Sequence, residues 1–400
     1  MGGQAGPAAC LLVAHTVPPL LGGSASVYAA LATAAAGQIA VLTSRRDHVS
    51  GAERPGWREA DAAAPYPVHR IGLVRPPLAG GVAATLSWAP GAARLALSVA
   101  RLARRHQVRA VCLADDETVG WLIPLVRRRL GLRALAYCHG DDLVQQDGRA
   151  VARRRRWLAE ADRVVAASSF AARRLEEAYA VAPGRIALIP NGVELSLFRP
   201  LPPDPAFAAA LGLSGRVILA ATRLVPRKGV DRLIEALPAV LRAVPDAVLA
   251  VAGEGPQRAE LEARARGLPV RFLGAVPQAR LPELYALAEV VALPNRAEPG
   301  EADGIAMTLL EAQACGRPVI GGRAGGSPEA IADGASGLLV EGGDAEAVAA
   351  ALVRVLTDAA LAARLSAGAL AVSAGRGWAD RARAFLELCR GGGDGAGAGP

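Results

Sequence analysis

Aromatic residues, lysine and long apolar runs are all scarce in this sequence. Only 4% of its 400 residues are aromatic, so a hydrophobic core must be built mainly from Ala, Leu and Val. No apolar run reaches the roughly 18 residues that a membrane-spanning helix needs. The N-terminal segment lacks the basic stretch of a signal peptide, and its apolar run at residues 8–14 is short. We therefore expect neither a membrane-spanning nor a secreted protein.

Cysteine is also sparse, and its placement excludes two classes of protein. The five cysteines, Cys10, Cys112, Cys138, Cys315 and Cys389, are scattered without metal-ligand spacing, and an odd number cannot pair fully. With 52% hydrophobic and 20% charged residues, the composition excludes disorder for most of the chain. These features predict a globular protein with reduced thiols, located in the cytoplasm and without a resident metal.

Positive charge is concentrated in the first half of the chain. Residues 1–200 carry 25 Arg, no Lys and 15 acidic residues, a net charge of +10, whereas residues 201–400 carry −2. The Arg runs at 127–129 and 153–156 fit either a solvated helix face or a surface that attracts an anionic partner. A membrane surface or a phospholipid-like acceptor is favoured over nucleic acid, because no aromatic interleaving or nucleic-acid motif accompanies the arginines. Peripheral association with the inner membrane face is therefore an alternative to a purely cytoplasmic location.

Lysine is represented by a single residue, Lys228, against 44 Arg. Under such a bias, a retained Lys suggests a site where a compact ammonium works and a planar guanidinium does not, chance survival being the alternative. Lys228 lies in a segment, residues 223–229, that follows an expected strand and precedes an expected helix. Arg223 and Lys228 near a helix start predict an anion site, to which the helix dipole adds.

Short apolar runs alternate with longer Ala-, Leu- and Arg-rich segments along the whole chain. This alternation predicts an α/β protein whose parallel sheets are covered by helices. The expected strands lie at residues 10–14, 39–43, 110–113, 134–138 and 163–167, and at 217–221, 247–252, 270–273, 290–293, 318–321 and 337–340. The two halves predict two Rossmann-like domains, with ligands bound beyond the carboxyl ends of the strands in the cleft between them.

A proline-rich stretch at residues 198–205 separates these halves. We place the first domain at residues 1–198 and the second at 199–377. The sequence predicts a final amphipathic helix at residues 378–390. The Gly- and Ala-rich residues 391–400 predict a disordered tail.

Two segments of the first half carry candidate site residues. Gly22 and Gly23 follow the first expected strand and open a helix, which suits either a phosphate or a tight turn. They do not form the G-x-G-x-x-G pattern of dinucleotide-binding enzymes. His139 follows the fourth expected strand, where α/β proteins keep reactive groups, although a loop histidine without a role is the alternative. Asp141 and Asp142 beside it lack the second ligand cluster that a metal site would need.

The second half carries two carboxylates eight positions apart. Asp303 is expected in a loop and Glu311 on the helix that follows, and carboxylates accept hydrogen bonds from sugar hydroxyls. A surface loop and an ordinary helix glutamate are the alternative, which is weakened because the segment 304–316 is otherwise uncharged. A second glycine-rich loop at residues 322–329 also suits a phosphate.

These motifs occur together in the order and spacing of a known enzyme family. The residues that carry the likeness are Arg223, 228–229, 251–256, 272–274, 281–285, 310–319 and 325–329, joined in the first half by 18–19, Gly22, Gly23, His139, 168–170 and 190–193. The sequence resembles the retaining glycosyltransferases of family 4 (group 1), and its pattern is similar to bacterial phosphatidylinositol mannosyltransferases and exopolysaccharide glycosyltransferases.

The resemblance implies a GT-B fold and a sugar-transfer reaction. In this fold two Rossmann-like domains face each other across a cleft, the first holding the acceptor and the second the nucleotide, and the last helix crosses back to the first domain. The implied reaction moves a hexosyl group of mannose or glucose type from a nucleotide diphosphate sugar, GDP-mannose or a UDP-hexose, with retention. The implied acceptor is a hydroxyl of a glycan or a lipid-linked molecule. No cofactor and no obligatory metal are implied.

The resemblance also assigns roles to individual residues. Arg223 and Lys228 would neutralise the diphosphate, and Glu311 would hold the ribose hydroxyls. Asp303 stands where the family's E-x7-E motif has its first glutamate, and its side chain is one methylene shorter. Glu301 is the alternative residue for that glutamate's role, although its spacing to Glu311 differs from that of the motif. His139 would contact the donor sugar or the acceptor. The remaining nucleotide-binding positions would be Gly22, Gly23, Gly253, Gly274, Val276, Gly304 and Ile305.

The chemistry of the reaction restricts the mechanism. Departure of the nucleotide diphosphate builds negative charge, which fixed cations and helix N-termini can stabilise in place of a metal. No clear pair of carboxylates supports double displacement, which favours same-face attack assisted by the departing phosphate. Three alternatives remain: a GT-B epimerase that acts on UDP-N-acetylglucosamine, a NAD-dependent Rossmann enzyme, and a non-catalytic nucleotide-sugar-binding protein.

Overall fold

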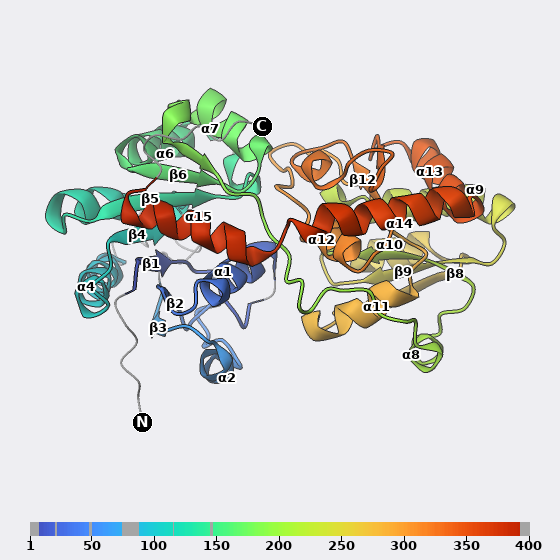
Figure 1. The fold of residues 1–400 in the computed structure, drawn as a ribbon, viewed down its shortest axis with the longest axis horizontal. Coiled ribbons are helices and arrows are strands. Elements are labelled where there is room, and N and C mark those ends of the chain that lie inside the picture. The colour runs from blue at the N-terminus through green and yellow to red at the C-terminus, as the bar shows by residue number, and fades with distance from the viewer. Residues whose placement is uncertain are drawn as a thin grey trace. The chain divides into compact units, whose positions relative to one another are not determined.

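The computed structural model describes residues 8–20, 22–47, 50–73, 88–114, 116–144 and 147–392 (Figure 1). The contacts within it divide the chain into two compact units. The first unit comprises the residues up to Asn191 together with those from Trp378 onward. The second unit comprises Gly192–Gly377. Each unit is a parallel α/β domain, as the alternation of strands and helices predicted.

The first unit contains a seven-stranded parallel sheet in the order β3-β2-β1-β4-β5-β6-β7. Its strands are β1 (Cys10–Val13), β2 (Ile39–Ser44), β3 (Val68–Ile71), β4 (Ala110–Leu113), β5 (Arg133–Cys138), β6 (Arg163–Ala166) and β7 (Ile186–Leu188). Its helices are α1 (Gly23–Ala34), α2 (Trp57–Ala63), α4 (Ala89–Arg105), α5 (Asp116–Val119), α6 (Gly148–Glu160), α7 (Ser169–Tyr179) and α15 (Trp378–Arg390). The strand order reverses between β1 and β4, which is where doubly wound sheets bind ligands.

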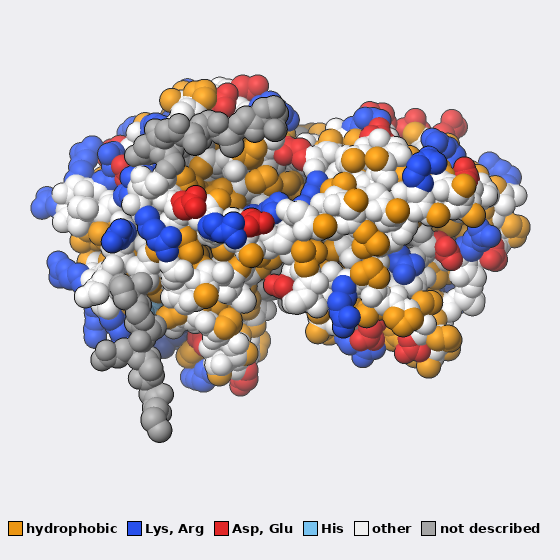
Figure 2. Space-filling model, viewed as in Figure 1, with side chains coloured by type: hydrophobic (Ala, Val, Ile, Leu, Met, Phe, Trp, Pro, Cys, Tyr) orange, Lys and Arg blue, Asp and Glu red, His pale blue; other side chains and the backbone are white. Residues whose placement is uncertain are grey.

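The last helix, α15, belongs to the first unit although it follows the whole second unit in sequence. Figure 1 shows it in red beside α1, which it contacts together with β4. Phe385 and Cys389 on its inner face are fully buried, and the Phe385 ring lies 6.3 Å from that of Tyr137 on β5. Its outer face carries charges of both signs, visible in Figure 2. Of the tail expected to be disordered, residues 393–400 lie outside the described residues.

The second unit contains a six-stranded parallel sheet in the order β10-β9-β8-β11-β12-β13. Its strands are β8 (Arg216–Ala221), β9 (Ala247–Ala252), β10 (Val270–Gly274), β11 (Val290–Leu293), β12 (Val319–Gly322) and β13 (Gly337–Val340). Its helices are α8 (Pro205–Ala210), α9 (Val230–Ala243), α10 (Arg258–Arg264), α11 (Leu281–Leu287), α12 (Met307–Ala314), α13 (Ala345–Thr357) and α14 (Ala359–Ala374). The order reverses between β8 and β11, which identifies the corresponding ligand edge of this sheet.

The division between the units falls earlier than the proline-rich stretch suggested. We expected the first domain to end at residue 198, but Phe198 is buried in the core of the second unit, with its ring 6.1 Å from that of Tyr285. Val193 bridges to Gly377 within the same unit, and its N–H donates to the carbonyl of Arg376 over 2.8 Å. The apolar segment before the prolines therefore contributes to the second core, because burial of Val193 and Phe198 outweighs the local sequence signal.

The eleven strands expected from the sequence are all present, with ends that differ by one residue at most. Among the described residues, β3 and β7 are additional, and both lie at edges of the first sheet. No described helix combines the length and the apolarity that crossing a membrane requires.

Candidate active-site residues

His139 follows β5, beside the point where the strand order of the first sheet reverses. Its Nε2 lies 2.8 Å from the hydroxyl of Tyr28 on α1, and that hydroxyl donates to the carbonyl of Ala114 over 2.6 Å. A carbonyl can only accept, so the Tyr28 proton is used in that bond and Nε2–H of His139 donates to Tyr28. This arrangement leaves Nδ1 as the nitrogen of the neutral imidazole that can accept a proton.

An ion pair between Asp142 and the buried Arg154 holds the loop that carries His139. Asp142 Oδ1 accepts hydrogen bonds from the backbone N–H groups of His139 and Gly140, with N–O distances of 3.1 and 2.8 Å. Asp142 Oδ2 lies 2.7 Å from the guanidinium of Arg154 on α6, whose side chain is 1% exposed. Burial alone would raise the pKa of Asp142, but the Arg154 charge and the hydrogen bonds from Arg154 and the Gly140 N–H outweigh burial, so this pKa lies below its ordinary value. Asp142 therefore stays ionised and fixes the backbone under His139.

Gly22 and Gly23 lie where the sequence predicted, at the start of α1. Gly22 is the N-cap residue and α1 begins at Gly23. No described side chain caps this helix end, so the first backbone N–H groups of α1 remain available to an anion.

The single lysine of the chain lies at the carboxyl edge of the second sheet. The segment after β8 forms a turn of 3₁₀ helix (Pro226–Lys228) that leads into α9. The Nζ of Lys228 lies 2.9 Å from Oδ2 of Asp303, and both side chains are largely buried. Arg223, the other cation predicted here, is exposed at the same edge.

The structure adds a third cation that the sequence analysis did not single out. Arg227 is buried, and its Nε lies 2.9 Å from Oδ1 of Asp303 while its NH1 lies 2.6 Å from Glu301. Both carboxylate oxygens of Asp303 are thus engaged, one by Arg227 and one by Lys228. Glu301, the substitute considered for the motif glutamate, is half-exposed and pairs with Arg227. The shorter aspartate therefore contacts the cationic turn in this structure.

Glu311 is buried on α12 in the same unit. Its Oε2 accepts a hydrogen bond from the hydroxyl of Tyr285 on α11 over 2.9 Å. Burial raises the pKa of Glu311 to about 7, although the bond from Tyr285 acts in the opposite direction. Burial and the nearby Glu311 raise the pKa of Tyr285 well above its usual value, so Tyr285 stays a donor. Tyr285 is a second residue that the sequence analysis did not assign to the site.

Backbone geometry explains why glycine occupies one of the predicted nucleotide-binding positions, independently of any ligand. Gly253, just after β9, has a φ of 139°, and a Cβ built there would lie 1.8 Å from the carbonyl oxygen of Thr222. The backbones that follow β8 and β9 approach too closely for any side chain. Gly274 ends β10 and accepts the N–H of Gly253 over 2.7 Å. Glycine is therefore required at position 253 whether or not a nucleotide binds there.

The other predicted nucleotide-binding positions belong to the same unit. Val276 and Ile305 are half-buried and pack against its core. Gly304 lies between Asp303 and the uncapped start of α12. The second glycine-rich loop supports the backbone at Asp303, because the N–H of Gly326 donates to the Asp303 carbonyl over 3.0 Å.

Comparison with known proteins identifies the family. A model of Glycosyltransferase Family 4 matches residues 21–197, and a model of Glycosyl transferases group 1 matches residues 215–358. The GDP-mannose-dependent alpha-(1-6)-phosphatidylinositol monomannoside mannosyltransferase of Mycobacterium tuberculosis (strain ATCC 25618 / H37Rv) is 32% identical over 386 residues, which cover 92% of each chain. This chain belongs to glycosyltransferase family 4. The enzyme of the same description from Mycolicibacterium smegmatis is 36% identical over 292 residues, which cover 70% of this chain and 74% of the relative.

Solved structures show the same fold. The Anabaena protein HepE in complex with UDP and glucose has a TM-score of 0.76 and 19% identity, over 96% of this chain and 99% of HepE. The fold of this family 4 chain is therefore GT-B, as the sequence predicted. Its membership makes it a glycosyltransferase that uses a nucleotide-sugar donor.

Proposed function

We propose that this glycosyltransferase transfers a hexosyl group, with retention and without an obligatory metal, from a nucleotide diphosphate sugar to a hydroxyl of a lipid-linked or glycan acceptor. The observation that carries the proposal is the cluster of Lys228, Arg227 and Asp303 at the ligand edge of the second sheet. GDP-mannose is the first candidate donor, because the mycobacterial relatives are named as GDP-mannose-dependent mannosyltransferases. UDP-hexoses are the second candidates.

The cationic turn is proposed to stabilise the leaving group. Cleavage of the bond between the anomeric carbon and the phosphate oxygen transfers an electron pair to the nucleotide diphosphate. Lys228 and Arg223 would stabilise that charge, and the start of α12 would add its N–H groups. A departing phosphate oxygen would take the proton of the acceptor hydroxyl, which attacks on the same face of the sugar. The products are then the nucleoside diphosphate and a glycoside of retained configuration.

Asp303 is proposed to orient Lys228. Its two oxygens hold Lys228 and Arg227 at 2.9 Å each, so the ammonium is placed before the diphosphate arrives. A preorganised charge costs no reorganisation during the reaction, which is the condition for strong electrostatic catalysis. His139, held by Asp142 and Tyr28, is proposed to contact the reacting sugar or the acceptor hydroxyl.

The proposal is tested by a thermal-shift panel of GDP, UDP, ADP, their sugar conjugates and NAD, each with and without EDTA. One nucleoside diphosphate and its sugar are expected to raise the melting temperature by about 5 °C or more at about 100 times Kd, because a ligand bound only by the native state stabilises it. EDTA is expected to leave the shift unchanged. NMR of the product formed with an acceptor would then report the anomeric configuration. A shift with NAD alone, or with none of these compounds, would contradict the proposal.

The pKa of Glu311 leads to a prediction about protons. Unliganded Glu311 is about half protonated at pH 7, and ribose hydroxyls that donate to its carboxylate would favour the charged form and lower its pKa. Binding of the nucleotide identified in the panel is therefore expected to release about half a proton at pH 7, and affinity should rise with pH up to about 7. Calorimetry in two buffers of different ionisation enthalpy measures this release.

The Glu311→Gln variant is the control for this experiment. It retains the shape of the side chain but cannot titrate, so its binding enthalpy should not depend on the buffer. Its affinity should also vary less with pH between 6 and 8. Equal proton release by the wild type and Glu311→Gln would assign the proton to another group and contradict the ribose role of Glu311.

A further inference from the structure

The loop that follows β11 carries an arginine, Arg296, whose side chain joins two carboxylates of different segments. Its Nη1 lies 2.8 Å from Oδ1 of Asp231, in the first turn of α9, and its Nε lies 2.7 Å from Oε1 of Glu298. Only 19% of the Arg296 side chain and 5% of the Asp231 side chain are exposed, so salt screens this pair little. The backbone N–H of Arg296 also donates to the carbonyl of Arg227 over 2.9 Å. Arg296 therefore connects its loop to the segments on both sides of Lys228.

A tight turn continues this loop from Glu298 to Glu301. The backbones of these two residues form an antiparallel bridge, with N–O distances of 3.1 and 2.9 Å. Gly300 lies within the turn at a φ of 72°, which glycine adopts without strain. The carboxylate of Glu301 lies 2.6 Å from the guanidinium of Arg227. Arg296 thus holds one arm of the turn, through Glu298, and Arg227 holds the other.

The contacts continue from this turn to the lysine. Asp303, two residues beyond Glu301, has one carboxylate oxygen 2.9 Å from Nζ of Lys228 and the other 2.9 Å from Nε of Arg227. The position of the ammonium is therefore set by two segments, residues 227–231 and 296–303. Arg296 belongs to the second segment and contacts the first through both its side chain and its backbone.

Charge is balanced across these two segments and the next residue of α9. Residues 227–232 and 296–303 together contain four cations and four carboxylates. Burial alone would lower the pKa of Arg296, but its bonds to Asp231 and Glu298 outweigh burial, so this pKa lies above its ordinary value. Loss of Arg296 would leave Asp231 paired with Arg232 alone, at 3.3 Å, and would leave Glu298 without this cation.

We propose that Arg296 is a positioning residue for sugar transfer. By joining Asp231 to Glu298, it holds the Asp303 loop against the turn of Lys228 and so places the ammonium for the leaving diphosphate. The inference rests on the proposed function, in which Lys228 stabilises the leaving group, and it names a residue that maintains that geometry. A preorganised charge acts only from its correct position, and a displacement of about 1 Å can cost about 10²-fold in rate.

A double-mutant cycle with Lys228 tests the inference. With the donor identified in the thermal-shift panel, Arg296→Met is expected to lower kcat about tenfold, within the range of coupling between members of one ion-pair network. In the Lys228→Ala background the same substitution should change kcat little, because no ammonium is left to position. A purely structural role would lower kcat by the same factor in both backgrounds, and that result would overturn the inference.

Two further variants separate position from charge. Arg296→Lys keeps the charge but lacks the planar fork that reaches two carboxylates, so only part of kcat should return. Arg232→Met is the matched control, because Arg232 also pairs with Asp231, while none of its ion pairs in the described part of the chain reaches residues 296–303. It should leave kcat unchanged. Full recovery by Arg296→Lys, or an equal loss in Arg232→Met, would assign the effect to charge and overturn the positioning role.

The double variant of Arg296→Met with Asp231→Asn guards against a misfolded single variant. It removes the carboxylate that Arg296→Met leaves at a buried position, so it should be more stable than the single variant. Its kcat should stay low, because the connection between α9 and the loop is still broken. Recovery of kcat in the double variant would assign the loss to the uncompensated charge and contradict the positioning role.

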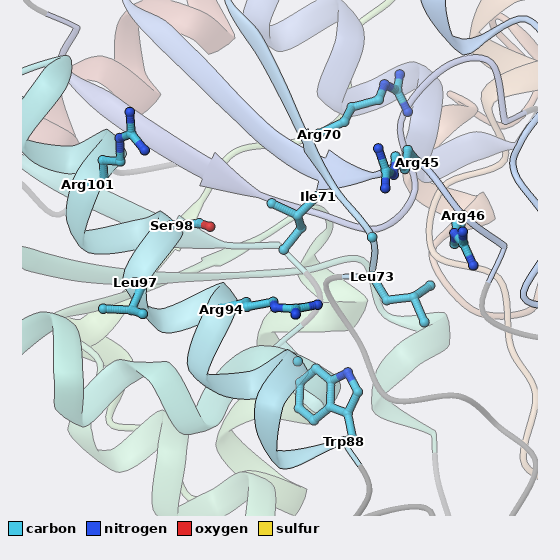
Figure 3. Close-up of a pocket in the computed structure, with 12 residues that line it drawn as sticks. Arg45, Arg46, Arg70, Ile71, Leu73, Trp88, Arg94, Leu97, Ser98 and Arg101 are labelled. Atoms are coloured by element: carbon cyan, nitrogen blue, oxygen red, sulfur yellow. The ribbon is translucent and has the colours of Figure 1, made fainter.

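An ion pair of the first unit controls for lost stability. Arg70 on β3, labelled in Figure 3, has a buried side chain that pairs with Asp61 on α2 over 2.8 Å. Arg70→Met and Arg296→Met should both lower the free energy of unfolding, because each breaks a pair that joins two segments. Only Arg296→Met should also lower the affinity for the nucleoside diphosphate in calorimetric titration. An equal loss of affinity in Arg70→Met would reduce the effect to stability and overturn the inference.

The cycle also distinguishes failure of this inference from failure of the proposed function. Full turnover by Lys228→Ala would refute the leaving-group role, and the positioning role of Arg296 would fall with it. Loss of turnover in Lys228→Ala, together with an equal effect of Arg296→Met in both backgrounds, would refute the positioning role alone.

Discussion

Replacement of Lys228 by alanine is expected to lower kcat by about 10²–10³-fold, the range seen when one preorganised donor to a developing charge is removed. The reason is that Lys228 is the compact cation held by Asp303 at the ligand edge of the second sheet. Donor affinity should fall as well, because the diphosphate carries charge before the bond breaks. Initial rates and nucleotide titrations with the donor identified by thermal shift measure both effects.

Two further variants test this result. Lys228→Arg should not restore turnover, because the side chain is only 14% exposed and a planar guanidinium needs more room than an ammonium. Arg266→Ala removes an exposed cation of the same unit and should leave kcat unchanged. Asp303 keeps its bond to Arg227 in the Lys228 variants, so they should fold. Full turnover by Lys228→Ala with unchanged donor affinity would refute the leaving-group role.

Arg154→Met is expected to lower the free energy of unfolding by about 3 kcal/mol, near the lower end of what breaking a buried ion pair costs. Asp142, whose side chain is 27% exposed, would lose its cation while its carboxylate still accepts hydrogen bonds from the backbone of the His139 loop. The backbone at His139 and Gly140 should then loosen. Chemical denaturation measures the stability change. If His139 contacts the reacting sugar, kcat should also fall, with little change in donor affinity.

The matched control for Arg154 lies two residues further along α6. Arg156→Met removes an exposed arginine from the same helix and should change stability by less than about 0.5 kcal/mol. The double variant of Arg154→Met with Asp142→Asn should be less destabilised than the sum of the two single variants, because the two side chains interact directly. If Arg154→Met lowered the free energy of unfolding no more than Arg156→Met does, the ion pair between Arg154 and Asp142 would not hold the loop.

The strands that the sequence predicted are those with a strong burial signal. β1 and β4 bury every residue, so their apolar runs are plain in the sequence. β3 is partly exposed along its whole length, and its sequence mixes apolar and charged or polar residues, so it carries no clear strand pattern. What secures it comes from distant residues: His69 lies 2.7 Å from His106 at the end of α4, and Arg70 pairs with Asp61. Such partners cannot be inferred from a window of four residues.

The candidate site divides in a similar way. Lys228 was indicated by its rarity and Glu311 by its position in an uncharged segment. In the second unit of the structure, Glu311 is buried and the Lys228 side chain is 14% exposed. Arg227 is one of 44 arginines, so nothing in its local sequence distinguished it from solvated ones. Tyr285 lies 26 positions from Glu311, and only the packing of α11 on α12 brings them together. The roles proposed for these residues remain predictions.

The membership of α15 in the first unit has a consequence for biosynthesis. During translation, the ribosome produces the first unit as far as Asn191 and then the entire second unit before it reaches Trp378. Until α15 has been synthesised, the first unit is incomplete, and the apolar surface that Phe385 and Cys389 cover in the folded protein is exposed to water. The second unit is continuous in sequence and can fold as soon as it has emerged. The half of the protein that is made first is thus the half that is finished last, and until then its uncovered apolar surface is where a chaperone would bind.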